Sequence, residues 1–152
     1  GAKLSWKDLD AVAVPSGPGR FTGIRIGMAF AAILAMKLKI PALALSRLEA
    51  AAEKCCEDDI LAALPGWKEE VYSQLFKRRK TGLASMEDAV WTLPAAWPAA
   101  RAQAEAKGLS VSFHDTDARD LLPVARRYLA AKKIPPFKPF YLKPAGYERP
   151  AR

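Results

Sequence analysis

The residues best suited to chemistry lie in a turn between an apolar run and a long stretch of helix-forming residues. The turn contains Gly-Pro-Gly at 17–19 and is followed by Arg20 and Thr22. A strand that enters a helix through such a turn leaves free N–H groups at the helix start, with the positive end of the helix dipole behind them. This geometry binds anions. The candidate phosphate-binding residues are Ser16, Gly17, Gly19, Arg20, Thr22 and Gly23.

The same turn also has a purely structural interpretation, which the pattern alone favours. Glycines permit a tight strand-to-helix turn, and Gly23 and Gly27 permit close packing of the helix. Enzymes that transfer phosphoryl groups hold the nucleotide between two glycine-rich loops and use carboxylates to bind Mg²⁺. This sequence supplies one such loop, with Asp10 as the nearest acidic residue before it. Phosphoryl transfer is therefore not predicted.

Neither a metal site nor a catalytic set is predicted. His114 is the only histidine, and Cys55 and Cys56 are adjacent in the sequence. Zinc sites need three or four ligands, and the sequence offers no Ser-His-Asp or Cys-His arrangement. Neighbouring cysteines rarely bridge to each other because the geometry is strained, so we expect reduced thiols in a cytoplasmic protein.

Composition and charge are those of a globular, basic protein. The chain has 152 residues, of which 51% are hydrophobic and 26% charged, with a net charge of +8 and a pI near 9.7. This charge suits an acidic partner such as RNA. However, the basic run Lys77–Lys80 is not interleaved with the aromatic residues that stack on bases. The apolar run Ile26–Met36 is too short to span a bilayer, so no membrane association is expected.

The first part of the chain predicts a βαβ unit. Asp10–Val14 and Ile40–Leu45 are short apolar runs typical of buried strands, and Gly23–Lys37 between them is rich in helix formers. This order of elements gives parallel strands with a right-handed crossover. Ser46 and Glu49 match a capping box at the start of the next helix.

The second part predicts a hairpin followed by alternating strands and helices. Runs with alternating apolar residues at 59–64 and 70–76 flank Pro65-Gly66, which indicates an antiparallel hairpin. We expect a lobe boundary near residue 57, with residues 1–57 in one lobe and 58–152 in the other. Strands are expected at 89–93 and 109–113, helices at 94–107 and 117–132, and an extended proline-rich tail from residue 134.

Four segments resemble the TsaB (YeaZ) family of tRNA threonylcarbamoyladenosine biosynthesis proteins, whose older description is glycoprotease-like or peptidase-M22-like. Residues 17–29 are similar to the family's GPGSFTGLRIGLA signature, with Arg20 in place of the usual Ser. Residues 40–50 are similar to its IPLVGVSSLEAL segment, and the hairpin resembles the strand pair that opens its second lobe. Residues 140–144 resemble its closing P-x-YLR-x-P. The resemblance is strong over residues 8–50 and looser afterwards.

The resemblance implies an α/β fold of the actin-like ATPase (RNase H-like) type and a non-catalytic scaffold role. Proteins of this family pair with TsaD, which carries the metal and the active site, and TsaE joins them. The complex transfers a threonylcarbamoyl group to the adenosine next to the anticodon of ANN-decoding tRNAs. TsaD and TsaE are therefore the implied partners, with tRNA reached through the complex and a homodimer possible. The resemblance implies no cofactor in this chain, and nucleotide only at the junction with TsaD.

The sequence departs from the family pattern in three places. The family begins with a β-hairpin, a strand that holds the first phosphate loop and a long helix, so an incomplete N-terminal lobe with an unpaired sheet edge is implied. The usual Asp-Ala-Arg-x-Gly before the second hairpin strand is replaced by Pro65-Gly66-Trp67-Lys68-Glu69. The region before the last helix lacks the usual Gly-Asp-Gly loop. The phosphate loop is accordingly interpreted as vestigial.

The helix at 23–37 is the strongest functional candidate, because it is apolar nearly all round and must be covered on more than one side. One side is expected to pack on the sheet. The resemblance implies that another side packs across a dimer interface, where small residues allow close approach. The pattern alone leaves simple burial within the monomer equally open. The expected partner-binding residues are Ile24, Met28, Ala31, Ala32 and Ala35.

Two further functions remain open from the sequence. A basic tRNA-binding module using Lys77–Lys80 would lose tRNA affinity steeply with salt. A scaffold, by contrast, would bind little tRNA until its partner is present. The chain is also compatible with a truncated, inactive actin-like ATPase homologue.

Overall fold

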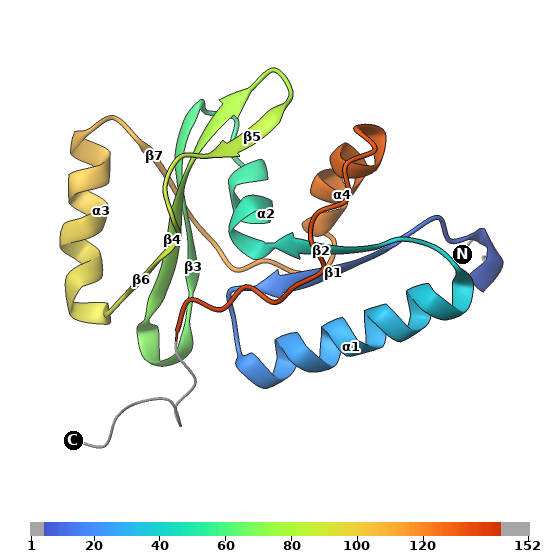
Figure 1. The fold of residues 1–152 in the computed structure, drawn as a ribbon. Helices are drawn as coiled ribbons and strands as arrows, with labels where there is room; N and C mark the ends of the chain where they lie inside the picture. Colours follow the sequence, from blue (N-terminus) through green and yellow to red (C-terminus); the bar gives the residue numbers. More distant parts are fainter. Residues whose placement is uncertain (1–4, 144–152) are drawn as a thin grey trace.

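The computed structural model describes residues 5–143, which form two β-sheets and four α-helices (Figure 1). The smaller sheet has two strands and the larger has five. Helix α2 (Arg47–Glu53) lies between the sheets, while α1 (Phe21–Leu38) and α3 (Trp97–Ala106) lie on outer sides (Figure 1). The mixed α/β class expected from the sequence is confirmed.

The smaller sheet is the predicted βαβ unit. Strands β1 (Val12–Gly17) and β2 (Ala42–Ser46) are parallel, and α1 connects them. Within residues 5–143, β1 has β2 as its only ladder partner. A short 3-10 turn, Trp6–Asp8, precedes β1.

The two faces of the smaller sheet are covered by different helices. Val14 and Ala44 pack against the buried side of α1. On the opposite face, Leu43 packs with Leu121 of α4 (Leu121–Ala130), which is shorter than the predicted helix at 117–132. Helix α4 was assigned by sequence to the second lobe, yet it packs on the first sheet. The lobe boundary near residue 57 stays a prediction, and α4 contacts the smaller sheet from the other side of it.

The larger sheet contains the predicted hairpin. Strand β3 is antiparallel to β4 and parallel to β7, in the order β5-β4-β3-β7, and β6 also pairs with β4. Strand β5 was not expected from the sequence. A 3-10 turn, Pro94–Ala96, leads into α3, and another, Trp67–Glu69, joins β3 to β4. The strands are β3 (Asp59–Pro65), β4 (Val71–Arg79), β5 (Gly82–Ser85), β6 (Val90–Thr92) and β7 (Ser110–Phe113).

Helix α2 is the centre of the core. Leu48 and Ala51 are fully buried against Ile60 and Leu64 of the larger sheet. Ala50, on another side of the same helix, is buried with the smaller sheet and α4. The helix therefore buries apolar surface against both sheets, which is the main source of stability for such an element.

The tail after α4 runs without regular secondary structure across the smaller sheet and toward the larger one (Figure 1). The backbone N–H of Phe140 donates to the carbonyl oxygen of Ser16 at 2.8 Å. Lys143 Nζ lies 2.6 Å from Oε1 of Glu70 on the hairpin. The predicted extended tail is confirmed up to residue 143, and its last part, with Pro144 and Pro150, lies outside the described residues.

Candidate functional site

Helix α1 buries one face against the smaller sheet and leaves the other uncovered. The buried face consists of Ile24, Met28, Ala31 and Ala35, whose residues are 2–7% exposed. These four lie at helical spacing of three or four residues, which places them on a single stripe. The stripe packs against Val14 and the strand next to it.

Because this stripe is buried, the candidate contact surface is the opposite face of α1. Four of the five residues expected to bind a partner form the buried stripe, so burial within the monomer accounts for them. The fifth, Ala32, is exposed. The surface available to a partner is instead the α1 outer face, which we define by its four large exposed residues, Ile26, Phe30, Ile33 and Met36.

The α1 outer face is strongly apolar. Its four residues are 63–76% exposed. Scattered exposed hydrophobic residues are ordinary, but a contiguous apolar strip on a helix usually marks an interaction surface. Sequence reasoning missed these residues because a helix that is apolar all round has no periodicity that separates its inner face from its outer face.

Among the described residues, α1 is also the one helix long and apolar enough to cross a membrane, judged by length and composition. Helices that pack against protein meet the same criteria. The property therefore identifies α1 as a helix with an extensive apolar surface.

The inner side of the predicted phosphate loop is filled by the tail. Ser16 is 5% exposed, and its carbonyl oxygen accepts the hydrogen bond from Phe140. Gly17 has a φ of +128°, in the region that favours glycine, and a Cβ there would collide with the Phe140 carbonyl oxygen. This side of the loop thus serves packing between β1 and the tail.

The outer side of the same loop carries charged and polar groups. Arg47 Nη1 donates to the carbonyl oxygen of Pro18 at 2.8 Å, and Gly19 lies beside the same guanidinium. Arg20 places its guanidinium carbon 5.4 Å from the ring centroid of Trp67. The remaining predicted loop residues, Thr22 and Gly23, are exposed in the first turn of α1. The predicted loop residues therefore lie in three places. Ser16 and Gly17 contact the tail. Gly19 and Arg20 lie on the outer side of the loop, and Thr22 and Gly23 belong to α1.

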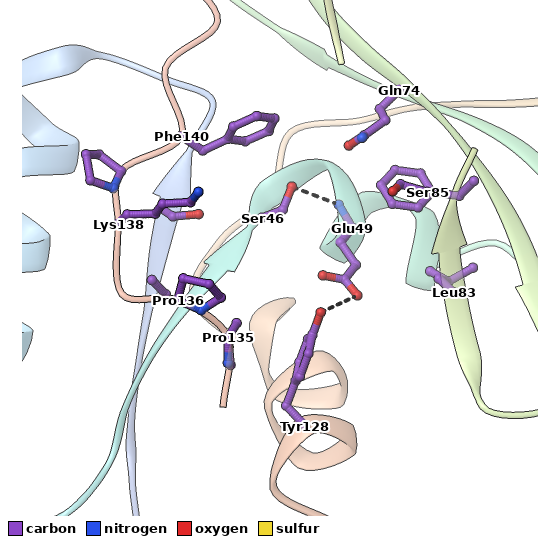
Figure 2. Close-up of a pocket in the computed structure, with 14 residues that line it drawn as sticks. Ser46, Glu49, Gln74, Leu83, Ser85, Tyr128, Pro135, Pro136, Lys138 and Phe140 are labelled. Atoms are coloured by element: carbon purple, nitrogen blue, oxygen red, sulfur yellow. Dashed lines mark hydrogen bonds between the residues drawn. The ribbon is translucent and has the colours of Figure 1, made fainter. Parts of the chain in front are cut away.

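A cavity of about 370 Å³ lies between α2, α4, the β4–β5 hairpin and the tail (Figure 2). Glu49, 8% exposed, lies in its wall and accepts from Arg127 Nη2 at 2.8 Å and from the Tyr128 hydroxyl at 3.5 Å. Burial and, less strongly, the Glu49 carboxylate raise the pKa of Tyr128. Figure 2 shows Pro135 and Pro136 of the tail on one side of the cavity, facing α4.

The contacts of Glu49 correct one detail of the predicted capping box. Ser46 Oγ accepts the Glu49 N–H at 3.4 Å, which confirms the cap itself (Figure 2). The Glu49 carboxylate does not close the box, because Arg127 and Tyr128 of α4 hold it instead. The carboxylate thus joins α2 to α4 at this cavity and is already engaged by two donors.

Metal-binding and nucleophilic groups are sparse in the part of the chain that the structure describes. Within it, no group of three or more His, Cys, Asp or Glu side chains is placed to hold a metal ion. Cys55 and Cys56 are free thiols. His114 is exposed, at the end of β7.

The basic run at 77–80 is partly used within the fold. Lys77 Nζ lies 2.9 Å from Asp59 Oδ1, and Arg78 donates to the carbonyl oxygens of Glu57, at 3.3 Å, and of Cys55. Residues 79 and 80 are exposed. Half of the run is therefore committed to internal contacts, which weakens the case for a dedicated nucleic-acid surface.

Comparison with known proteins gives consistent results. Residues 1–132 match the family described as TsaD, tRNA N6-adenosine threonylcarbamoyltransferase. Two relatives from Buchnera aphidicola, both described as "tRNA threonylcarbamoyladenosine biosynthesis protein TsaB", are 35% and 39% identical over 85 and 84 residues. Each alignment covers 53% of this chain and only 38% or 40% of the relative. The chain thus matches about two fifths of the length of these relatives.

A solved structure from Pseudomonas aeruginosa shares the fold. It is described as an uncharacterized protein with similarity to peptidase YEAZ and superimposes with a TM-score of 0.68 at 24% identity. The match covers 92% of this chain and 76% of that one. The superposition shows that the two proteins share their fold.

Proposed function

Because the chain belongs to the TsaD family and groups within it with the TsaB (YeaZ) proteins, we propose that it is a non-catalytic subunit of the tRNA threonylcarbamoyladenosine machinery. The names of the two Buchnera aphidicola relatives support a role in tRNA threonylcarbamoyladenosine biosynthesis. The proposal includes an actin-like (RNase H-like) fold and a cytoplasmic location. The role is that of a scaffold which reaches tRNA through its complex.

The observation that carries this proposal is the α1 outer face. A subunit that works by association needs an apolar surface that is incomplete in the isolated chain, and the α1 outer face is such a surface. Phe30, near its middle, is 65% exposed. Large aromatic side chains at the centre of an apolar patch supply a large share of binding energy in protein interfaces.

We propose TsaD as the partner that covers this face, with TsaE joining the pair and a second copy of the chain as the alternative occupant. Nucleotide would bind at the junction with TsaD. The earlier candidates Ile24, Met28, Ala31 and Ala35 would then support the interface from beneath by fixing α1 on the sheet. Ala32 would contribute directly, since it is exposed on α1.

Sedimentation velocity with purified TsaD tests the proposal. We expect the wild-type chain to co-sediment with TsaD and Phe30→Glu to lose that association, because a carboxylate would be desolvated in an apolar contact. Leu122→Glu is the matched control, since Leu122 is a 50% exposed apolar residue on α4. The control should associate normally. Equal association by both variants would exclude the α1 outer face as the binding surface.

A further inference from the structure

The cavity between α2, α4, the β4–β5 hairpin and the tail is a candidate ligand site, separate from the α1 outer face (Figure 2). Its volume is about 370 Å³. An apolar cavity of about 150 Å³ inside a protein is large enough to hold benzene. On the same scale, this cavity suits a small molecule of about twelve to fifteen non-hydrogen atoms.

Glu49 supplies this cavity with a strong acceptor. The residue is 8% exposed, and Arg127 Nη2 and the Tyr128 hydroxyl both donate to the same carboxylate oxygen, Oε1. Within residues 5–143, no group donates to the other oxygen, Oε2. Figure 2 shows that oxygen turned toward Pro135 and Pro136 of the tail. Because hydrogen bonds to an ionised carboxylate are stronger than neutral ones, Oε2 is the main polar contact that the cavity offers.

Gln74 of β4 adds a second acceptor. Its Nε2 donates to the backbone carbonyl oxygen of Glu87 at 3.0 Å, which fixes the amide and leaves its oxygen as an acceptor. Figure 2 shows the Gln74 side chain directed toward Ser46 and Glu49. Ser46 Oγ accepts the Glu49 N–H, so its own O–H remains available to donate. The polar lining therefore consists mainly of acceptors, with a hydroxyl beside them.

The rest of the lining is apolar, and its charge excludes two classes of ligand. Phe76, Phe140 and three prolines of the tail contribute apolar surface. Arg127 balances the charge of Glu49, and the exposed Lys138 adds a positive charge to the wall. A cation is therefore disfavoured by the local charge, and an anion is disfavoured by the two free acceptor oxygens. These features favour a neutral molecule that carries several donors on an apolar ring.

We propose that this cavity binds a neutral monosaccharide. Hydroxyl groups of the sugar would donate to Glu49 Oε2 and to the amide oxygen of Gln74, while the C–H face of the ring would pack against Phe140 and the tail prolines. A hexose lies within the size range that the cavity volume sets. The proposal does not depend on the scaffold function, because neither Glu49 nor Gln74 belongs to the α1 outer face.

Isothermal titration calorimetry of the full chain with D-glucose and D-ribose tests the proposal. We expect one saturable site for at least one of these sugars. Cyclohexanol keeps an apolar six-membered ring but has a single hydroxyl, so it should bind at least about tenfold more weakly than the sugar. D-glucosamine carries a positive charge and should bind no more tightly than D-glucose.

Two glutamine substitutions give a matched comparison. Gln74→Met keeps the length of the side chain but removes its acceptor, and should weaken sugar binding by about threefold to tenfold. Gln103→Met makes the same change at an exposed position on α3 and should leave binding unchanged.

Glu49→Gln should weaken sugar binding by about tenfold or more, since a hydrogen bond to a charged group is lost. Ser85→Phe keeps the proposal testable if that variant fails to fold. Ser85 is an exposed residue that lines the cavity, so a phenyl ring there should block sugar binding without lowering the melting temperature. The proposal would be overturned by absence of saturable sugar binding, by equal affinities of Gln74→Met and Gln103→Met, or by sugar binding no tighter than that of cyclohexanol. Tighter binding of D-glucosamine than of D-glucose would also overturn it, because the ligand would then be a cation.

Discussion

Helices α1 and α2 are both apolar and alanine-rich, but they meet their surroundings differently. α2 lies between the two sheets, and Leu48, Ala50, Ala51 and Ala52 have no exposed surface. α1 is covered on one side only, so its outer face keeps four large apolar residues in contact with solvent. The same composition therefore serves internal packing in α2, whereas in α1 it combines packing on one side with an apolar surface exposed to solvent on the other.

The difference follows from position in the chain rather than from propensity. α2 links the last strand of the smaller sheet to the first strand of the larger one, so both sheets close on it. α1 crosses between two strands of one sheet, and only that sheet is available to cover it. An apolar helix in that position needs a second layer, which the described part of the chain does not supply for its outer face.

The largest difference between two substitutions is expected at two methionines on opposite sides of α1. Met28 is 6% exposed and Met36 is 76% exposed. Met28→Glu should destabilise the chain severely, by several kcal/mol, because it buries a carboxylate without a partner. Met36→Glu should change the free energy of unfolding by no more than about 0.5 kcal/mol. Urea denaturation followed by circular dichroism measures both, and equal effects would mean that α1 does not pack as described.

Truncating a side chain should lower the free energy of unfolding more in α2 than on the α1 outer face. Leu48→Ala in α2 removes a fully buried side chain and should lower the free energy of unfolding by about 2–5 kcal/mol. Phe30→Ala on the α1 outer face removes a larger side chain but should have little effect, since that side chain is already in water. Thermal unfolding of the isolated variants checks this order. A larger loss for Phe30→Ala would show that the α1 outer face is covered in the isolated chain.

Much of the fold could be predicted from local sequence signals. The βαβ unit follows from apolar runs at Asp10–Val14 and Ile40–Leu45 around a helix-forming stretch, and the hairpin follows from Pro65-Gly66 between alternating runs. Strand β5 was missed because Gly82–Ser85 is short and has no alternation. It forms by pairing with β4, a contact that the local pattern does not encode.

The candidate sites depend on contacts between residues that are far apart in the sequence. Local patterns therefore predicted the surroundings of these sites less well than they predicted the helices and strands. The loop at 16–23 was identified as a possible anion site, but nothing local indicated that the tail would fill its inner side. Nor did any pattern bring Arg20 to Trp67, or α4 to the first sheet. On α1, the uniform apolar composition hid which face would be buried, so the predicted contact residues fell mostly on the inner stripe.

The ion pair between Glu49 and Arg127 joins α2 to α4. Glu49→Gln keeps the side-chain volume but leaves the Arg127 guanidinium without its carboxylate in a partly buried position. We expect a loss of about 1.5–3 kcal/mol in the free energy of unfolding, since hydrogen bonds to charged groups are worth this much. Glu105→Gln, which breaks the exposed Arg101–Glu105 pair on α3, is the control and should cost about 0.3–0.5 kcal/mol. Equal urea midpoints for the two variants would contradict the anchoring role.

The smallest effect is expected from the tyrosine that shares this anchor. Burial raises the pKa of Tyr128 above its ordinary value of 10.0. The unfolded chain therefore loses this proton at a lower pH than the folded chain, so the associated stability is present below about pH 10 and is lost as the pH rises through the folded pKa. Tyr128→Phe should consequently show a shallower decline in the free energy of unfolding on the alkaline side than the wild type. The difference between the two proteins should be independent of pH near neutrality, where Tyr128 is protonated in both states. Parallel curves throughout the alkaline range would mean that Tyr128 is as solvated in the folded chain as in the unfolded one, and that α4 does not close over Glu49.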